Sequence, residues 1–354
     1  MTGFESDIRS QGQLLAALLT VDRQDALLAR AAALADPGRP IVFTGMGSSL
    51  AAARSAAARV AAGGLWSTVG EAGELLHYGL EALPKGSLVV LVSQSGRSAE
   101  TTALGERLLA AGGRRIIAIV NDPASPIARM ADVVVPIRAG EEATVSTKTF
   151  VATLVLLHGL ADALIGAGGD TVESALRDGL VERVGAVLAD AAIAGPAASA
   201  FAGVQALVLV GRGPGFTAAD YGALILKEAC AIPAEAMFAG SFRHGPIEIT
   251  GPSTGVIVVA PPGRTSSLCI RLAEDTARLG SPTWLLTGPG DGSNGGITGA
   301  GSNGLMVSSL PGVAERFAPF LYCLPLQHLA VRLAVLRHRE PGIVERSGKV
   351  TVSE

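Results

Sequence analysis

Short unbroken runs of apolar residues recur along the first half of the chain, and each run ends in a turn rich in Gly, Ser or Pro. The runs cover residues 41–43, 88–92, 116–120 and 133–137, and Ala/Leu/Arg-rich stretches of helical length separate them. Unbroken Val/Ile/Leu runs that alternate with helices are typical of parallel strands buried on both faces. The pattern therefore predicts an α/β fold.

The second half of the chain repeats this pattern at nearly constant spacing. Its apolar runs cover residues 207–210, 256–260, 283–286 and 305–307, and they follow their first-half counterparts by 166 to 172 residues. Such regular spacing indicates a duplicated unit. We expect two domains, at 1–194 and 195–354, each a doubly wound parallel sheet flanked by helices.

Three longer stretches have apolar positions at helical spacing, and one stretch has no apolar period. We expect helices within 8–34, 146–165 and 314–339. The Gly-rich segment 288–304 has low complexity, so we expect an exposed, mobile loop there rather than a site. The longest apolar runs fall short of the roughly 18 residues that indicate a membrane span.

Composition and charge exclude several classes of function. Charged residues make up only 17% of the 354 residues, the net charge is −3, and no basic run occurs, which argues against nucleic-acid binding. The three cysteines form no CxxC motif and no metal-ligand spacing, and the polar, acidic N-terminus does not resemble a signal peptide. We expect a cytoplasmic protein without a metal ion or cofactor, binding neither nucleic acid nor membrane.

The first candidate site follows the apolar run 88–92, which leads into V-S-Q-S-G-R-S-A-E-T-T. The motif places hydroxyl and amide groups in a loop that opens a helix, and backbone N–H groups at a helix N-terminus attract anions. No lysine follows the glycine, so the motif is not a nucleoside-triphosphate loop. We therefore expect a cradle for a phosphate on a small molecule. Its candidate residues are Ser93, Gln94, Ser95 and Ser98.

A second polar turn, T-G-M-G-S-S at 44–49, follows the first apolar run and contributes Ser48 and Ser49. It lacks the third glycine of the dinucleotide-binding fingerprint, so a nicotinamide site is not expected. Parallel strands present their carboxyl ends at one edge of the sheet, where α/β proteins bind ligands. The two serine-rich turns therefore predict an uncharged pocket for a sugar phosphate. Ser146, at a predicted helix start, is either a helix cap or a further ligand contact.

Three ionisable residues are candidates for catalysis. Glu228 lies in an apolar context near a helix end, where desolvation would raise its pKa and suit it to act as a general base; the alternative is a structural ion pair with Lys227 or Arg243. His244 lies in an R-H-G-P turn and is either catalytic or structural. Lys349 lies in a polar tail and reaches a site only if the tail docks.

Taken together, several motifs in a fixed order resemble the sugar isomerase (SIS) family in its tandem form. They are G-M-G-S-S, V-S-Q-S-G-R-S-A-E-T, V-S-T-K-T-F, L-K-E-A-C-A-I-P-A-E-A, H-G-P, P-L-Q-H-L-A and a terminal K-V-T. The likeness covers nearly the whole chain. It is strongest to the isomerase half of glucosamine-6-phosphate synthase and to glucosamine-6-phosphate deaminases of the same fold.

This resemblance implies a role for each candidate residue. Glu228 matches the base that moves a proton between C1 and C2 of the sugar, and Lys349 matches a lysine that reaches the sugar's reactive end. His244 matches a residue that opens the sugar ring from the neighbouring subunit, which implies a homodimer. Residues matching those that hold the substrate are Ser48, Ser49, Ser93, Gln94, Ser95 and Ser98 for the phosphate and Ser146 for the sugar hydroxyls.

The chain also departs from the synthase pattern. Lys349 aligns only across a one-residue gap, and Tyr221 stands where the synthase has a glutamate, seven residues before the base. We expect no glutaminase domain before residue 1 and therefore no synthesis from glutamine. The resemblance then implies a phosphosugar aldose–ketose isomerase that deaminates glucosamine 6-phosphate to fructose 6-phosphate and ammonia. The alternatives are a fructosamine-6-phosphate deglycase, a galactosamine- or tagatose-phosphate isomerase, and a phosphosugar-binding regulatory protein.

Overall fold

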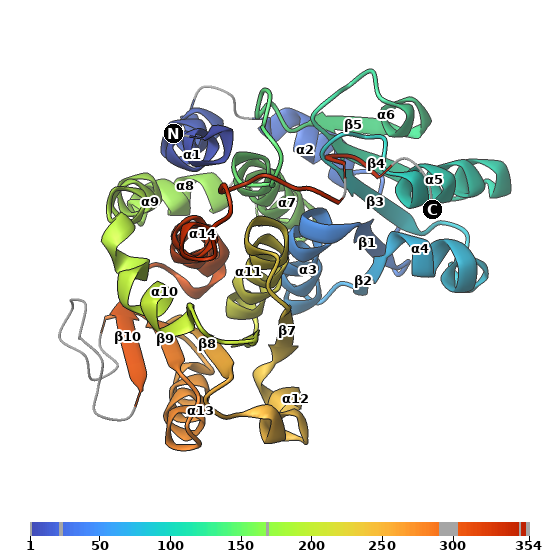
Figure 1. The fold of residues 1–354 in the computed structure, drawn as a ribbon. Helices are drawn as coiled ribbons and strands as arrows, with labels where there is room; N and C mark the ends of the chain where they lie inside the picture. The colour runs from blue at the N-terminus through green and yellow to red at the C-terminus, as the bar shows by residue number, and fades with distance from the viewer. Residues whose placement is uncertain (1, 21–23, 168–169, 290–303, 347, 352–354) are drawn as a thin grey trace. The chain divides into compact units, whose positions relative to one another are not determined.

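The computed structural model describes residues 2–20, 24–167, 170–289, 304–346 and 348–351. Within these ranges the chain forms two compact units. The first unit comprises Gln13–Glu142, Lys148–Leu176 and Glu345–Glu354, and the second comprises Met1–Gly12, Ala143–Thr147 and Arg177–Val344. Each unit contains one parallel sheet and its flanking helices (Figure 1).

The first unit is built on a five-stranded sheet with the order β2-β1-β3-β4-β5, in which every neighbouring pair is parallel. Its central strands are apolar and buried along nearly their whole length, as expected for strands covered on both faces. The strands are β1 (Ile41–Gly45), β2 (Ser67–Glu71), β3 (Leu88–Ser93), β4 (Arg115–Val120) and β5 (Val133–Pro136).

Helices cover the two faces of this sheet. On one face α4, α5 and α6 pack against side chains of β3 and β4, while α3 packs on β1 and β2 and lies against α7. The α7 helix is mostly apolar and is buried along most of its length, together with a few polar side chains such as His158 and Asp162. The helices are α2 (Asp25–Ala32), α3 (Gly47–Ala62), α4 (Ala72–Glu74), α5 (Ala99–Ala111), α6 (Pro126–Met130), α7 (Lys148–Leu164) and α8 (Asp170–Arg177), with short helical turns at Leu75–Gly79 and Leu80–Ala82.

The second unit has a parallel sheet of the same kind, with the order β10-β9-β8-β6-β7. Numbered within each unit, both sheets have the strand order 2-1-3-4-5, so the first strand in sequence lies between the second and the third. The strands are β6 (Ala206–Gly211), β7 (Ala234–Phe238), β8 (Thr254–Ala260), β9 (Thr283–Thr287) and β10 (Leu305–Ser309).

The helices of the second unit include two long ones, α11 and α14, which run side by side (Figure 1). On one face of the sheet, α12 and α13 bury apolar side chains against β6 and β8. The elements are α9 (Leu180–Ala189), α10 (Gly195–Phe201), α11 (Pro214–Cys230), α12 (Ala239–Arg243), α13 (Ser266–Arg278) and α14 (Ala318–Leu336), with short turns at Ala191–Ala194, Pro246–Ile249 and Glu315–Phe317. The first helix, α1 (Gly3–Thr20), contributes residues to both units, because the division between them falls after Gly12.

The structure confirms the predicted α/β fold with two parallel sheets flanked by helices. All eight predicted strands form, but the sequence analysis missed β2 and β7. Both are edge strands that pair on one side only, and their S-T-V-G-E and A-E-A-M-F sequences are largely half-buried or exposed. Because a partly exposed edge strand needs no continuous apolar run, the pattern that identified the central strands does not detect it.

The compact units differ from the division at residues 194 and 195 expected from the sequence. Residues 177–194 pack with the second sheet, and the C-terminal tail packs with the first. The sequence division remains a prediction about where the duplicated halves join.

Two of the three predicted helices form as single elements, and the third is divided. The stretch 8–34 forms α1 and α2, while α7 and α14 match the predicted helices 146–165 and 314–339 to within a few residues. The segment Glu315–Leu336 is long and apolar enough to cross a bilayer, but 78% of its most apolar window is buried, as in a core helix. Within the Gly-rich stretch 288–304, residues 290–303 lie outside the described residues.

All three cysteines are buried and free, and all three belong to the second unit. Burial raises the pKa of the Cys230 thiol to about 12 and also raises the pKa values of Cys269 and Cys323.

Candidate functional site

The serine-rich turn between β3 and α5 is held by hydrogen bonds among its own residues. The Ser93 hydroxyl at the end of β3 is buried and lies 3.2 Å from the Ser98 hydroxyl. The Gly96 N–H donates to Ser93 Oγ at 3.2 Å, and the Arg97 N–H donates to Ser95 Oγ at 3.1 Å. Three of the four predicted cradle residues of this turn are therefore organised around one tight loop.

A glycine is required at the centre of this turn. Gly96 has φ +63°, and a Cβ atom there would lie 2.1 Å from Ser125 Oγ. The close approach lets the Gly96 carbonyl accept a hydrogen bond from the Ile127 N–H at 3.3 Å, while the Gln94 carbonyl accepts one from the Asn121 N–H at 3.0 Å. The loop is thus fixed to the segment that follows β4.

An ion pair also restrains the turn. Arg97 contacts Asp122 at 3.0 Å, and both side chains are largely exposed. The pKa of Asp122 is lowered, first by a hydrogen bond from the Ala124 N–H and then by Arg97. Exposure limits what this pair contributes to stability.

The second serine-rich turn lies at the same edge of the sheet. Ser48 and Ser49 are half-buried in the first turn of α3. Gly45, which ends β1, pairs with Val92 of β3, and a Cβ atom at Gly45 would lie 2.5 Å from the Val92 carbonyl oxygen. Because the two strands are adjacent, both serine-rich turns lie at one edge of the sheet, as expected; their binding of a phosphate stays a prediction.

The two helices that follow the serine-rich turns, α3 and α5, have no side-chain cap. Neither Met46 before α3 nor Ser98 before α5 accepts a capping hydrogen bond, whereas Ser125 Oγ caps the neighbouring α6 by accepting from the Ala128 N–H. First-turn N–H groups and the helix dipole both favour an anion. The edge thus combines hydroxyls with two helix starts that no N-cap side chain covers.

The C-terminal tail docks on the first unit. The Thr351 carbonyl accepts a hydrogen bond from the N–H of Ala99, the first residue of α5, at 3.0 Å. Lys349 Nζ donates to the main-chain carbonyl of Glu142, whose carboxylate accepts bonds from the N–H and hydroxyl of Thr149 at 3.0 and 2.6 Å. Glu142 therefore holds both the start of α7 and the tail, and the tail reaches the start of the cradle helix.

Ser146 lies in the second unit, where a buried polar network holds its backbone. The Tyr221 hydroxyl donates to the Ser146 carbonyl at 2.7 Å and accepts from Gln327 Nε2 at 2.9 Å, and Gln327 Oε1 in turn accepts from Gln11 Nε2 at 2.7 Å. The sequence analysis noted Tyr221 only as a departure from a family pattern and missed this contact. A fully buried phenol requires a polar partner, which is the signal that could have found it.

Glu228 lies half-buried in the last turn of α11, which ends in the left-handed residue Ala231. The two basic residues weighed as its ion-pair partners each contact another carboxylate. Lys227 lies 3.6 Å from Glu235, and Arg243 lies 2.6 Å from Asp275. Each of these cations therefore has a carboxylate partner other than Glu228.

His244 directly follows α12, and its side chain is exposed. Its N–H donates to the Ser241 carbonyl at 3.0 Å, and Gly245 follows with φ +112°. The histidine therefore lies on a tight turn at the surface of the second unit.

Of the predicted site residues, the serine cradle, Gln94 and Lys349 belong to the first unit, and Ser146, Glu228 and His244 belong to the second.

Comparison with known proteins finds a family match over the part of the chain that contains both serine-rich turns. The model of the SIS domain family matches residues 34–163, a range that contains both serine-rich turns. Residues 34–163 are therefore similar to an SIS domain. The chain is also 34% identical over 274 residues to a glutamine–fructose-6-phosphate aminotransferase (isomerizing) of Zymomonas mobilis, an alignment that covers 75% of this chain and 44% of the relative. The chain thus spans less than half the length of that relative.

Solved structures show that the fold is shared beyond the SIS match. The C-terminal domain of a glucosamine-fructose-6-phosphate aminotransferase from Francisella tularensis superposes with a TM-score of 0.81 at 22% identity, covering 96% of this chain and 98% of that one. A glucosamine-6-phosphate deaminase from Thermotoga maritima superposes with a TM-score of 0.75 at 21% identity, covering 99% of both chains. At these identities the likeness establishes the fold alone.

Proposed function

We propose that the protein is a phosphosugar aldose–ketose isomerase that deaminates glucosamine 6-phosphate to fructose 6-phosphate and ammonia. The observation that carries this proposal is the SIS cradle, where two serine-rich turns and two helix starts without side-chain caps meet at one sheet edge. Such donors hold a phosphate dianion, because each hydrogen bond to a charged group contributes about 1.5–3 kcal/mol. The chain shares its fold with the Thermotoga maritima deaminase, so this fold is compatible with the proposed outcome.

In the proposed reaction, Glu228 moves one proton from C2 to C1 of the sugar. His244 assists opening of the pyranose ring, which exposes the aldehyde at C1. The Glu228 carboxylate then removes the C2 proton and returns it to C1, so that the 2-amino carbon becomes an imine. Water adds to that imine and ammonia leaves, which gives the ketose 6-phosphate. Half-burial of Glu228 near the end of α11 suits a base that exchanges a proton with a bound substrate.

Residues outside the cradle complete the proposed site. Ser146 contacts the sugar hydroxyls, with its backbone fixed by Tyr221, and Lys349 approaches the sugar's reactive end from the docked tail. The exposed position of His244 supports a homodimer in which each subunit supplies this histidine to its neighbour. We place the enzyme in the cytoplasm, where its sugar-phosphate substrate is made and used.

A substrate panel tests the proposal. Purified protein is supplied with glucosamine 6-phosphate, galactosamine 6-phosphate, fructosamine 6-phosphates that carry an amino acid, and tagatose 6-phosphate. The release of ammonia, the release of an amino acid and the formation of ketose are followed. Turnover of glucosamine 6-phosphate with equal amounts of ammonia and fructose 6-phosphate is the expected result. Release of an amino acid from fructosamine 6-phosphate would instead identify a deglycase, and binding without turnover of any compound would identify a regulatory protein.

A further inference from the structure

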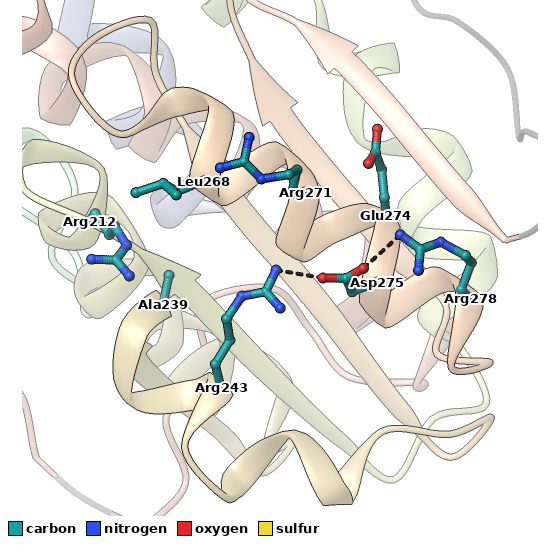
Figure 2. Close-up of a pocket in the computed structure, with 8 residues that line it drawn as sticks. All are labelled: Arg212, Ala239, Arg243, Leu268, Arg271, Glu274, Asp275 and Arg278. Atoms are coloured by element: carbon teal, nitrogen blue, oxygen red, sulfur yellow. Dashed lines mark hydrogen bonds and ion pairs between the residues drawn. The ribbon is translucent and has the colours of Figure 1, made fainter.

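A second polar pocket lies in the second unit, and the proposed reaction does not use it. It has a volume of about 400 Å³, at the lower end of the range typical of small-molecule sites. Figure 2 shows its lining, in which four arginines, one aspartate and one glutamate leave a formal charge of +2. The lining residues are Arg212, Ala239, Arg243, Leu268, Arg271, Glu274, Asp275 and Arg278.

The residues that line the pocket come from three segments of the second unit. In the second sheet, β6 lies between β7 and β8. Arg212 directly follows β6, Arg243 comes from α12 after β7, and Arg271 comes from α13 after β8. Arginines from three separate elements thus line this one pocket.

The arginines differ in how far the protein itself neutralises them. Asp275 lies 2.6 Å from both Arg243 and Arg278, and these contacts lower the pKa of Asp275. Among the residues that the structure describes, Arg212 and Arg271 form no ion pair, and the buried Nε of Arg212 has no hydrogen-bond partner. Two guanidinium groups therefore retain uncompensated charge beside the pocket.

The position of Arg212 depends on a close backbone approach. A Cβ atom at Gly240 would lie 3.0 Å from Arg212 Nη2, so the glycine lets the guanidinium rest against the first turn of α12. Figure 2 shows the Glu274 carboxylate pointing away from Arg243 and Asp275. The apolar side chains of Ala239 and Leu268 complete the lining without competing for the guanidinium groups.

We propose that this pocket binds a small molecule through a phosphoryl group held between Arg212 and Arg271. The planar fork of arginine matches the geometry of phosphate oxygens and donates two parallel hydrogen bonds to them. The volume leaves room for more than the phosphoryl group itself. This site differs in chemistry from the serine cradle, because it recognises the anion by charge rather than by neutral donors.

Calorimetric titration of the full-length protein with pyrophosphate tests the proposal. A double variant, Arg212→Gln with Arg271→Gln, is expected to bind pyrophosphate at the pocket about tenfold more weakly or not at all. Its matched control, Arg107→Gln with Arg115→Gln, removes two exposed arginines of the first unit and is expected to bind as the wild type does. Thermal melting without ligand verifies that both variants remain folded.

Two further titrations test whether the pocket selects a phosphoryl group by its charge and geometry. Glu274→Gln removes a negative charge from the lining and is expected to tighten pyrophosphate binding, whereas a structural effect of substitutions in α13 would weaken it. Malonate, a dicarboxylate, is expected to bind far more weakly than pyrophosphate. Equal affinity of the wild type and the Arg212/Arg271 double variant for pyrophosphate, or equal affinity of the wild type for malonate and pyrophosphate, would overturn the proposal.

Discussion

At the scale of single residues, the cradle depends on places where a side chain would not fit. Gly45 touches the carbonyl of Val92, and Gly96 touches Ser125, so each serine-rich turn closes only without a Cβ atom. The sequence analysis identified the serines from their place after apolar runs. It could not identify these contacts, because they join segments far apart in the sequence.

Gly96→Ala is expected to destabilise the first unit and to weaken phosphosugar binding, since the new methyl group would collide with Ser125. Gly112→Ala is the matched control, because Gly112 has nearly the same φ of +62° but no atom lies within 4 Å of the place that a methyl group would take. The control should lose about 1–3 kcal/mol from backbone strain, and Gly96→Ala should lose about 1–3 kcal/mol more from overpacking. Urea unfolding of both variants measures the difference, and equal losses would contradict the role given to this contact.

Glu228→Gln is expected to lower kcat for glucosamine 6-phosphate by about 10²–10⁴-fold, because a general base contributes that much to proton transfer. Substrate binding should change little, since the phosphate is held by the cradle. Glu235→Gln, which removes an exposed carboxylate of β7, serves as the control. Wild-type turnover by Glu228→Gln would refute the assignment.

Tyr221→Phe removes the hydroxyl that joins the Ser146 carbonyl to Gln327. Stability should fall by about 1–3 kcal/mol, because the Ser146 carbonyl and Gln327 Nε2 each lose one hydrogen bond. If the network positions Ser146 toward the sugar, KM should rise more than kcat falls. Steady-state kinetics separates this outcome from a loss of stability alone, which would leave both constants unchanged in the folded fraction.

At the scale of elements, two polar contacts fix α3 against α7. Arg59 of α3 forms an ion pair with the buried Asp162 of α7, and Ser55 Oγ lies 2.9 Å from His158 Nε2. Ser55 and Arg59 are four residues apart and so share one face of α3. Because α3 begins with Ser48 and Ser49, these contacts anchor the helix that presents half of the cradle.

Arg59→Met should therefore destabilise the first unit by about 3 kcal/mol, since it removes the guanidinium group that contacts the buried Asp162 carboxylate. Arg107→Met, which removes an exposed arginine of α5, should change stability by less than about 0.5 kcal/mol. Chemical denaturation of both proteins makes the comparison. Equal stability of the two variants would show that the ion pair contributes nothing.

The burial of each element explains how much of the fold could be predicted from the sequence. Central strands such as β3 and β8 are buried along their whole length, so each needs an apolar run that the sequence displays. The edge strands are set by long-range packing, which leaves no local pattern in the sequence. The same holds for residues 177–194, which pack with the second sheet, and for the C-terminal tail, which packs with the first. For the same reason, the pocket of arginines was not expected, because its residues come from three elements that only the sheet order brings together.

At the scale of the whole molecule, a buried histidine links stability to pH. Burial lowers the pKa of His328 below its ordinary value of 6.5, and its Nε2 lies 3.2 Å from the Val187 carbonyl. The unfolded chain therefore takes up a proton at a higher pH than the folded chain does. The stability that the neutral imidazole contributes is fully present above pH 6.5 and is lost as the pH falls below that value.

His328→Gln should accordingly flatten the dependence of unfolding free energy on pH between about pH 7.5 and 5. His77→Gln, which removes an exposed histidine, controls for the loss of an imidazole in general. Urea titrations at a series of pH values provide the measurement. An unchanged slope in His328→Gln would show that other groups determine the acid sensitivity.

Because all three thiols are buried in the second unit, their reactivity can report on local opening of that unit. A thiol-reactive dye needs an ionised, accessible sulfur, which the folded second unit withholds at every cysteine. Each labelling event therefore records a transient opening of that unit alone, and the first unit contributes no signal. Mass spectrometry of timed samples can thus follow the local opening of the second unit without the introduction of an engineered probe.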